Sequence, residues 1–279
     1  MNDSPQSPLI DLHSHSTCSD GSFAPARLIQ EAATRGVNTL ALTDHDTTAG
    51  LDEAEAAALE HGVDFVPGVE ITCEVAGTEV HLLGLGIDRT QRTLRELCED
   101  VQERRRRRFF QMIEKLRAHG VPLSSDDVKD GVSLARPYLA RMLVQQGKVG
   151  SYQEAFQRYL KKGCPGYIEH SRIPIKRAID AIQAAGGVAV LAHPGLYKNG
   201  DECVFEATRQ GLDGIECFHS DHSHNTAGHY VSLARKLKLL VSGGADFHGP
   251  DHARSKFFGQ KGCPPAEFER MQEAIAARS

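Results

Sequence analysis

The stretch DLHSHSTCSDGS, residues 11–22, places two histidines and two aspartates directly after a short apolar segment. In an extended strand, side chains two positions apart point to the same face, so His13 and His15 would face one site. Asp20 follows in the next loop. Burying imidazole and carboxylate groups together costs free energy unless something binds to them. Since both groups are ligands of divalent metal ions, the stretch predicts a metal site.

Further histidines and carboxylates stand at or near the ends of other apolar runs. The nine candidate metal ligands are His13, His15, Asp20, His45, Glu70, His81, His193, Asp246 and His248. Imidazole and carboxylate without thiolate suit manganese, iron or zinc rather than calcium or magnesium. Because one ion needs three or four such ligands, the set implies two or three divalent ions, with a carboxylate bridging a pair. We expect Mn2+ first, with Fe2+ or Zn2+ as alternatives.

The apolar runs that carry these residues alternate with helix-forming segments. The predicted strands are residues 9–13, 39–43, 65–66 leading into 69–72, 79–85, 188–192, 214–218 and 239–242. Several helical segments between them end in glycine, a common helix stop. Repeated strand–helix–strand order indicates an α/β fold with a parallel sheet, and closure into a barrel would gather the strand ends at one mouth. We therefore expect the nine side chains to share one pocket.

This alternation stops between residues 88 and 168, where one helical pattern follows another. We predict a barrel formed by residues 1–87 and 169–279, and an all-helical insertion, residues 88–168, that forms part of the substrate pocket. The insertion contains five consecutive arginines, Arg104–Arg108. At about 100° per residue they go all the way round a helix. We interpret the run as a solvated surface, with contact of one or two arginines with substrate as the alternative.

The composition excludes several classes of function. The chain has 279 residues and a formal net charge of −5, so no overall positive charge attracts nucleic acid or a membrane. Its seven cysteines, an odd number without a CxxC pair, are typical of a reduced protein. The first residues do not resemble a signal peptide, and no apolar run approaches the roughly 18 residues of a membrane span. We expect a cytoplasmic protein without membrane contact or an obligate protein partner.

Clustered divalent ions about 3.5–4 Å apart activate water and hold the oxygens of a phosphoryl group, so phosphate ester hydrolysis is the first hypothesis. The second is an amidohydrolase acting on a C–N or C–O bond, because that superfamily also opens with HxH. Its usual bridging ligand is a carboxylated lysine, yet no lysine occurs between Glu31 and Glu114, and Glu70 stands where a bridge is needed. This favours the phosphoesterase. A non-catalytic metal-binding scaffold is disfavoured because all nine candidate ligands are intact.

Six motifs occur in order along the chain: DLHSHSTCSDG, ALTDHDT, PGVEIT, EVHLLGLGID, LAHPG and SGGADFHG. Over nearly the whole chain they resemble the PHP (polymerase and histidinol phosphatase) family of metal-dependent phosphoesterases. The resemblance implies a distorted, TIM-like (β/α)7 barrel with three metal ions. It implies His13, His15, Glu70 and Asp246 as ligands of the first ion, Glu70, His81 and His193 of the second, and Asp20, His45 and His248 of the third. Asp44 and Asp46 would either orient neighbouring imidazoles or cap their loop.

The helical insertion narrows the resemblance to one branch. ARPYLARMLVQQG, followed by AIDAIQAAGGVAVLAHPG, resembles the stand-alone branch that includes 3′,5′-nucleotide bisphosphate phosphatases and the 5′→3′ exoribonuclease ribonuclease AM. This implies removal of the 3′-phosphate from nucleoside 3′,5′-bisphosphates, such as adenosine 3′,5′-bisphosphate, or 5′→3′ cleavage of short 5′-phosphorylated RNA. A histidinol-phosphate-type phosphomonoesterase is the alternative, although histidinol phosphatases usually lack this insertion.

Two groups of residues are candidates for contact with the substrate. His193 and His222 are the candidate catalytic proton donors to the leaving oxygen. The candidates for phosphate binding are Arg136, His222, Lys161 and Arg172. Arg136 is preferred because its planar guanidinium fits phosphate and because it precedes Pro137 at a predicted helix start, where backbone N–H groups favour anions.

Overall fold

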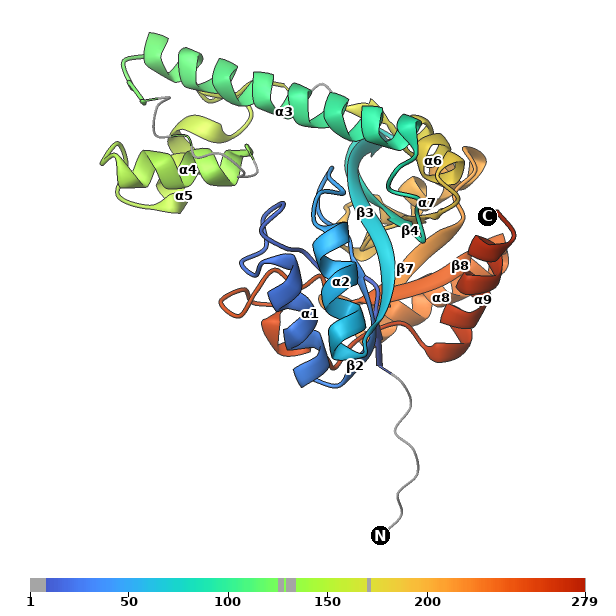
Figure 1. Cartoon of the computed structure of the whole chain (residues 1–279). Coiled ribbons are helices and arrows are strands. Elements are labelled where there is room, and N and C mark those ends of the chain that lie inside the picture. Colours follow the sequence, from blue (N-terminus) through green and yellow to red (C-terminus); the bar gives the residue numbers. More distant parts are fainter. Residues whose placement is uncertain (1–8, 125–127, 129–133, 170–171, 279) are drawn as a thin grey trace. The chain divides into compact units, whose positions relative to one another are not determined.

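The computed structural model describes residues 9–124, 128, 134–169 and 172–278. The chain divides into two compact units, one formed by Met1–Cys98 and Arg172–Ser279 and the other by Glu99–Ser171. Most of their helices and strands are labelled in Figure 1. The second unit begins within a long helix, after residue 88, where the sequence predicts that the insertion starts.

The first unit is an α/β structure on one mixed eight-stranded sheet, in the order β1-β2-β3-β4-β6-β7-β8 with β5 paired to β3. The strands are β1 (Leu9–Asp11), β2 (Val37–Leu42), β3 (Asp64–Val75), β4 (Thr78–Leu85), β5 (Ile173–Pro174), β6 (Val188–Leu191), β7 (Gly214–His219) and β8 (Leu240–Gly244). Neighbouring strands are parallel, except that β4 is antiparallel to both β3 and β6. The expectation of a fully parallel sheet is therefore wrong at β4.

A two-residue turn explains this difference. Ala76 and Gly77 join β3 to β4, and both have positive φ, 50° and 69°. Two such residues in succession form the tight turn of an antiparallel hairpin, whose twist matches that of its strands. The chain thus folds straight back onto β3, with no crossover helix between the two strands.

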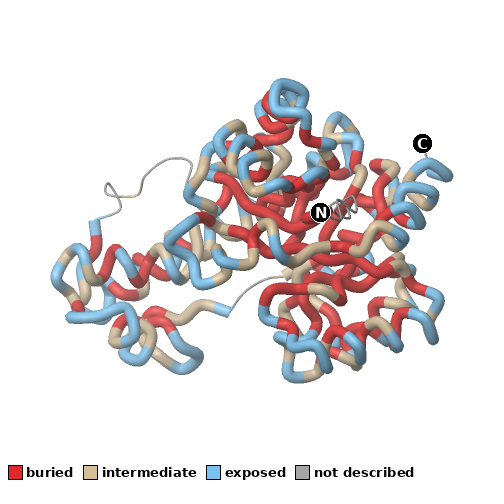
Figure 2. Tube along the Cα trace, turned by 90° about the horizontal axis from the view of Figure 1, so that it is seen from below, coloured by how far each residue is buried: buried red, intermediate tan, exposed pale blue. Residues whose placement is uncertain are grey.

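Helices accompany the sheet of the first unit: α1 (Pro25–Thr34), α2 (Leu51–His61), α6 (Ile175–Ala184), α7 (Gly200–Arg209), α8 (His224–Leu237) and α9 (Pro265–Ala276). They are amphipathic; α6, for example, buries Ile175, Ile179 and Ile182 on one face. In Figure 2 the buried segments fill the interior and the exposed segments lie outside. Because β6 is buried along its whole length, its sequence VAVL is continuously apolar.

Hydrogen bonds join the first strand and the residues after it to β8 and the residues after it. Leu12 N–H donates to Gly243 O at 3.2 Å, and His15 N–H donates to Phe247 O at 2.9 Å. Asp11 Oδ1 accepts from Ala245 N–H at 2.9 Å. These bonds hold the first and last candidate ligands of the sequence beside each other.

The second unit is helical in the residues that the structure describes. It contains most of α3 (Arg92–Ala118), then α4 (Arg136–Gln145), α5 (Tyr152–Ala155) and a short π-helix, η2 (Phe156–Leu160). It has a hydrophobic core of its own, which includes Phe109, Ile113, Leu139 and Leu143. All seven cysteines of the chain are free thiols. Among the described helices, none has the length and apolar character needed to cross a bilayer.

Gly244 lies where β8 approaches the first candidate ligand. A Cβ there would come within 2.5 Å of His13 Cβ and 2.9 Å of Asp11 Oδ1. Gly244→Ala should therefore lower the free energy of unfolding by about 1–3 kcal/mol, measured by urea denaturation.

Gly228 is the matched control, because it is an exposed residue of α8 around which a Cβ would meet no atom within 4 Å. Gly228→Ala should stabilise the protein by about 0.5–1 kcal/mol. A Gly244→Ala protein as stable as wild type would show that the strands are not packed this closely.

Candidate metal centre

The carboxylate of Glu70, in the middle of β3, is the centre of the site and is only 1% exposed. Five imidazole rings surround it. The distances are 3.0 Å from His81 Nδ1 and 3.3 Å from His193 Nε2 to Oε1, and 3.0 Å from His45 Nδ1, 3.3 Å from His15 Nε2 and 3.4 Å from His13 Nε2 to Oε2. Ligands from opposite ends of the sequence therefore meet at one buried carboxylate.

The hairpin register brings Glu70 and His81 together. Thr72 lies opposite His81 across the two strands, and Glu70 lies two residues before Thr72 on β3. Residues two apart on a strand, and residues directly opposite across strands, share a face of the sheet. Glu70 and His81 are therefore diagonal neighbours on one face, even though β4 runs in the direction that the sequence did not predict.

Asp246 closes the cluster on the side of β8. Its Oδ1 lies 3.4 Å from His13 Nε2, 3.2 Å from His15 Nε2 and 3.3 Å from His248 Nδ1. The Nε2 atoms of His13 and His15 thus face two carboxylates, those of Glu70 and Asp246. This is the group of four residues that the family resemblance implies for a first ion.

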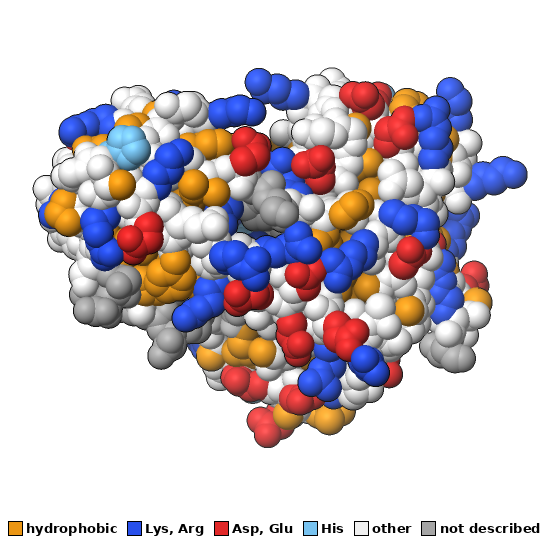
Figure 3. Space-filling model, turned by 90° about the horizontal axis from the view of Figure 1, so that it is seen from above, with side chains coloured by type: hydrophobic (Ala, Val, Ile, Leu, Met, Phe, Trp, Pro, Cys, Tyr) orange, Lys and Arg blue, Asp and Glu red, His pale blue; other side chains and the backbone are white. Residues whose placement is uncertain are grey.

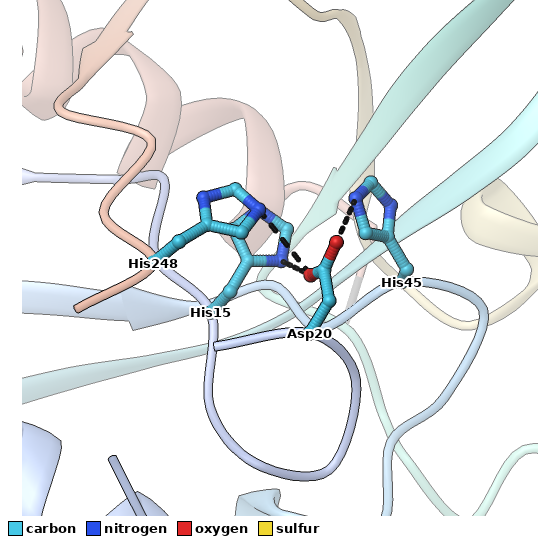
Figure 4. Close-up of side chains that lie close together, drawn as sticks. All are labelled: His15, Asp20, His45 and His248. Carbon is cyan, nitrogen blue, oxygen red and sulfur yellow. Dashed lines mark ion pairs between the residues drawn. The ribbon is translucent and has the colours of Figure 1, made fainter. Parts of the chain in front are cut away.

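Asp20 forms the centre of another group with His15, His45 and His248 (Figure 4). Its Oδ1 lies 3.2 Å from His248 Nε2 and 3.9 Å from His15 Nδ1, and its Oδ2 lies 3.9 Å from His45 Nε2. His15 and His45 therefore point one ring nitrogen toward Asp20 and the other toward Glu70. A neutral imidazole has one lone pair to give, so each of the two rings can serve a single ion.

Several polar atoms in the cluster are buried and have no hydrogen-bond partner within the described part of the chain. They are His13 Nε2, both ring nitrogens of His15, His45 Nδ1, Glu70 Oε2 and His193 Nδ1. Leaving such atoms unpaired costs about 1–3 kcal/mol each, and native structures rarely do so. A divalent cation accepts lone pairs from both atom types, so these residues fit bound metal ions.

The electrostatics keep the carboxylates ionised. Burial raises the pKa of Glu70, but the imidazoles of His45 and His81 beside it outweigh this effect and hold that pKa well below its usual range. For Asp246, the neighbouring imidazole of His13 likewise outweighs burial and lowers the pKa. Burial lowers the pKa of His45 to about 3, which keeps this ring neutral, the form that ligates metal.

Glu216, in β7, orients the imidazole of His13 and holds the backbone of His193, a role that the sequence did not indicate. Its Oε1 accepts from His13 Nδ1–H at 2.9 Å, and its Oε2 accepts from His193 N–H at 2.8 Å. A carboxylate can only accept, so the proton of His13 sits on Nδ1 and its Nε2 lone pair faces the cluster. Against the effect of burial, the interaction and hydrogen bond with His13 lower the pKa of Glu216 to about 2. The sequence signal was a single acidic residue inside the apolar strand GIECFH.

Arg254 and His219, which the sequence also did not indicate, contact the second carboxylate oxygen of Asp246, Oδ2. Arg254 donates to Asp246 Oδ2, and its Nε donates to Asp221 Oδ2 at 2.7 Å. His219 Nδ1 accepts from Asp221 N–H, so its proton is on Nε2, which lies 3.2 Å from Asp246 Oδ2. With Oδ2 bound in this way, Oδ1 is the oxygen directed at His13 and His15.

Asp44 and Asp46 fasten the loops that carry the ligands. Asp44 accepts hydrogen bonds from Ser16 N–H, Ser16 Oγ and Ser19 Oγ, at 2.8, 2.6 and 2.5 Å, and so shapes the loop that ends at Asp20. Asp46 accepts from Thr72 N–H at 2.7 Å and from Thr72 Oγ1 at 3.1 Å, which ties its loop to β3.

Three residues in or next to the cluster of candidate ligands have strained backbone conformations. Asp46, His193 and Asp246 have positive φ values of 53°, 34° and 52°, which non-glycine residues seldom adopt. Such conformations cost about 1–3 kcal/mol each and persist where the surroundings impose them. The contacts of Asp46 with Thr72, of His193 with Glu216 and of Asp246 with Arg254 supply that constraint.

The candidate substrate contacts are more dispersed. His222 is buried; its Nδ1–H donates to Cys217 O at 2.9 Å and its Nε2 accepts from Gly195 N–H at 3.1 Å. Arg172 pairs with Glu74 and Glu79 at 3.0 and 2.8 Å.

The other two candidates belong to the second unit. Arg136 is half-buried at the start of α4, and Lys161 is exposed after η2. Their contact with a substrate phosphate stays a prediction.

Comparison with known proteins gives a consistent result. The PHP domain family matches residues 11–161 of the chain. A 5′-3′ exoribonuclease of Haemophilus influenzae is 38% identical over 86% of this chain and 90% of its own length. A 3′,5′-nucleoside bisphosphate phosphatase of Chromobacterium violaceum is 37% identical over 86% of this chain and 87% of its own. A crystal structure from Bifidobacterium adolescentis, assigned as a metal-dependent phosphoesterase, is 28% identical, with a TM-score of 0.83 and 97% coverage of both chains.

Replacing Glu216 by glutamine tests whether this residue orients the ligands. A glutamine side chain has one acceptor oxygen, so it can satisfy either His13 Nδ1–H or His193 N–H but not both. We expect Glu216→Gln to weaken Mn2+ binding by about 10–100-fold, measured by isothermal titration calorimetry.

The matched control is Glu206→Gln, which removes a carboxylate on the exposed surface that contacts Arg209. Its Mn2+ affinity should equal that of wild type. Unchanged affinity in Glu216→Gln would show that Glu216 only fills space in the core.

Proposed function

The chain belongs to the PHP domain family and is a phosphoric ester hydrolase, and we propose that it removes the 3′-phosphate from nucleoside 3′,5′-bisphosphates. We propose that the same site cleaves short 5′-phosphorylated RNA in the 5′→3′ direction. Both relatives described above act on phosphate esters, as their names state. The two activities need the same phosphoryl chemistry and differ in the length of the substrate.

One observation carries this proposal: unpaired lone pairs of buried imidazoles and carboxylates converge on Glu70 and Asp246. We propose that two or three divalent ions, Mn2+ first, occupy the cluster. The proposed ligand sets are His13, His15, Glu70 and Asp246; Glu70, His81 and His193; and Asp20, His45 and His248. When bound, the ions supply an activated water and neutralise charge on the phosphoryl oxygens.

The residues of the chain have separate parts in this reaction. Glu70 and Asp246 hold negative charge at fixed positions, while Glu216 keeps the His13 proton on Nδ1. His193 and His222 both remain proposed proton donors to the leaving oxygen; burial lowers the pKa of each ring, which favours its neutral form. His222 holds its proton on Nδ1 and binds the backbone N–H of Gly195, two residues after His193, so it also positions this turn.

The second phosphate of the substrate needs a cation. Arg136 remains the proposed ligand because it is a half-buried residue in the first turn of α4, and Lys161 is the second choice. Arg172 is less suited, since Glu74 and Glu79 already compensate its charge.

For the fold we propose closure of the sheet into the distorted, TIM-like (β/α)7 barrel with an all-helical insertion that the family resemblance implies. The hydrogen bonds from Leu12 to Gly243 and from His15 to Phe247 support this, since they join the residues after the first strand to the last strand and to the residues that follow it. Closure explains how His13 and Asp246, 233 positions apart, contact one another.

The substrate is tested by comparing phosphate release from several compounds with the Mn2+-loaded protein. We expect adenosine 3′,5′-bisphosphate and a short 5′-phosphorylated RNA to react, and histidinol phosphate to react at least about tenfold more slowly, because the distal phosphate supplies binding energy. If histidinol phosphate is the best substrate, the assignment to this branch is wrong. Turnover of a lactone or amide alone would establish the amidohydrolase instead.

Asp20→Ala tests the third ligand set. Since Asp20 sits in a loop and is 39% exposed, its removal should leave the fold intact and reduce phosphate release by more than about 100-fold. Asp201→Ala is the control, because it breaks an exposed Asp–His pair with His229 outside the cluster. Wild-type turnover by a folded Asp20→Ala protein would contradict a reaction that uses three ions.

A further inference from the structure

The positive charge of the chain is concentrated in the helical unit. Residues 99–171 contain 14 lysines and arginines and 9 aspartates and glutamates, a formal charge of +5, while the rest of the chain has 18 and 28, a charge of −10. The net charge of −5 for the whole chain conceals this division. A basic segment in an acidic chain is a sign of a local site for a polyanion.

Three arginines of the run in α3 share one face of the helix. Arg104, Arg107 and Arg108 line a cavity of about 290 Å3 together with Asp100, Gln111 and Glu169. Arg107, Arg108 and Gln111 follow Arg104 by 3, 4 and 7 residues. This spacing places all four side chains on one face of the helix. The expectation that the five arginines spread evenly round the helix therefore misses a common face. We call Arg104, Arg107, Arg108 and Gln111 the arginine stripe.

Contacts within the unit hold the stripe at the wall of this cavity. Arg104 Nε donates to Asp100 Oδ1 at 2.8 Å, and Arg108 Nε donates to Ile168 O at 2.9 Å. Arg107 is 66% exposed, and its Nη2 lies 3.6 Å from Glu103 Oε1, a long ion-pair distance. An exposed pair of this kind contributes little, so an incoming anion can replace it. On the face seen in Figure 3, basic side chains are numerous and acidic ones lie among them.

The geometry points to an extended polyanion as the ligand. Successive stripe residues are separated by about 1.5–4.5 Å along the axis, and their long side chains can reach phosphates spaced along a strand. Asp100 and Glu169 would repel a compact anion buried in the cavity. Guanidinium groups bind phosphate through two parallel hydrogen bonds, and Gln111 adds an amide donor.

We propose that the arginine stripe binds the phosphodiester backbone of single-stranded RNA. This proposal adds a second contact for an RNA substrate to the proposed function. It rests on one part of that function, the cleavage of RNA, and not on the hydrolysis of bisphosphates. A nucleoside bisphosphate has no phosphodiester chain and gains nothing from the stripe. The stripe should therefore act on the KM for RNA and leave the hydrolysis of bisphosphates unchanged.

Two double variants with equal charge separate the stripe from the overall charge. Arg104→Gln/Arg107→Gln removes two stripe arginines, while Arg105→Gln/Arg106→Gln removes two neighbours on other faces of the same helix. The probe is a 5′-phosphorylated oligouridylate with a 3′ fluorescein, titrated by fluorescence anisotropy at several salt concentrations. The Asp20→Ala background, with Mn2+ present, keeps the probe intact.

We expect the stripe variant to bind about tenfold more weakly and to lower the salt slope by about 1.4, the value for two phosphate contacts on a single strand. The control variant should stay within about twofold of the parent. With active enzyme, the stripe variant should raise the KM for RNA about tenfold, with the kcat for adenosine 3′,5′-bisphosphate unchanged.

Equal weakening in both double variants would show that only overall charge matters and would overturn the proposal. Binding of polyglutamate as tight as that of the RNA at the same salt would also overturn it, in favour of an acidic protein partner. If wild-type protein hydrolyses neither bisphosphate nor RNA, the proposed function fails, while the anisotropy comparison still decides whether the stripe binds RNA.

Discussion

The structure depends on one buried carboxylate, Glu70, placed among five imidazole rings. An ionised carboxylate away from water is costly unless positive charge and hydrogen bonds compensate it. No lysine or arginine contacts Glu70 in the described structure; the surrounding groups are neutral or partly charged imidazoles with unpaired nitrogens. The proposed divalent cations would provide the charge that this arrangement lacks.

Other features of the fold serve this constraint. The tight turn at Ala76–Gly77 places His81 beside Glu70 on a strand that runs against its neighbours. Gly244 lets β8 approach His13 closely, and Glu216 fixes the proton of that ring. Strained backbone at His193 and Asp246 is the cost of aiming both side chains inward. Together these features place the ligand side chains around Glu70 with their lone pairs facing the cluster. Metal-assisted phosphoryl transfer requires this kind of preorganisation.

The sequence predicted the family and the class of reaction, and both are confirmed by the comparisons. It also predicted the gathering of His13, His45, Asp246 and the other candidates, because most of them follow parallel strands, whereas His81 reaches the cluster through the register of the antiparallel hairpin. The direction of β4 was missed, since hairpin geometry depends on the φ angles of two residues rather than on apolar periodicity. Glu216 was missed because its partner His13 lies 203 positions away in the sequence, and Arg254 was missed because it stands in a turn beyond the last of the six motifs. The arginine stripe was missed because net charge was considered over the whole chain.

The central claim is that Glu70 is shared by several divalent ions. The most direct measurement is the metal content of the protein purified from Mn-supplemented cells, determined by native mass spectrometry together with elemental analysis. The account predicts two or three ions in wild type, the loss of one in Asp20→Ala and the loss of at least two in Glu70→Gln, because only a bridging carboxylate serves more than one ion. A wild-type protein with at most one ion, or a Glu70→Gln protein that retains the full wild-type content, would contradict it.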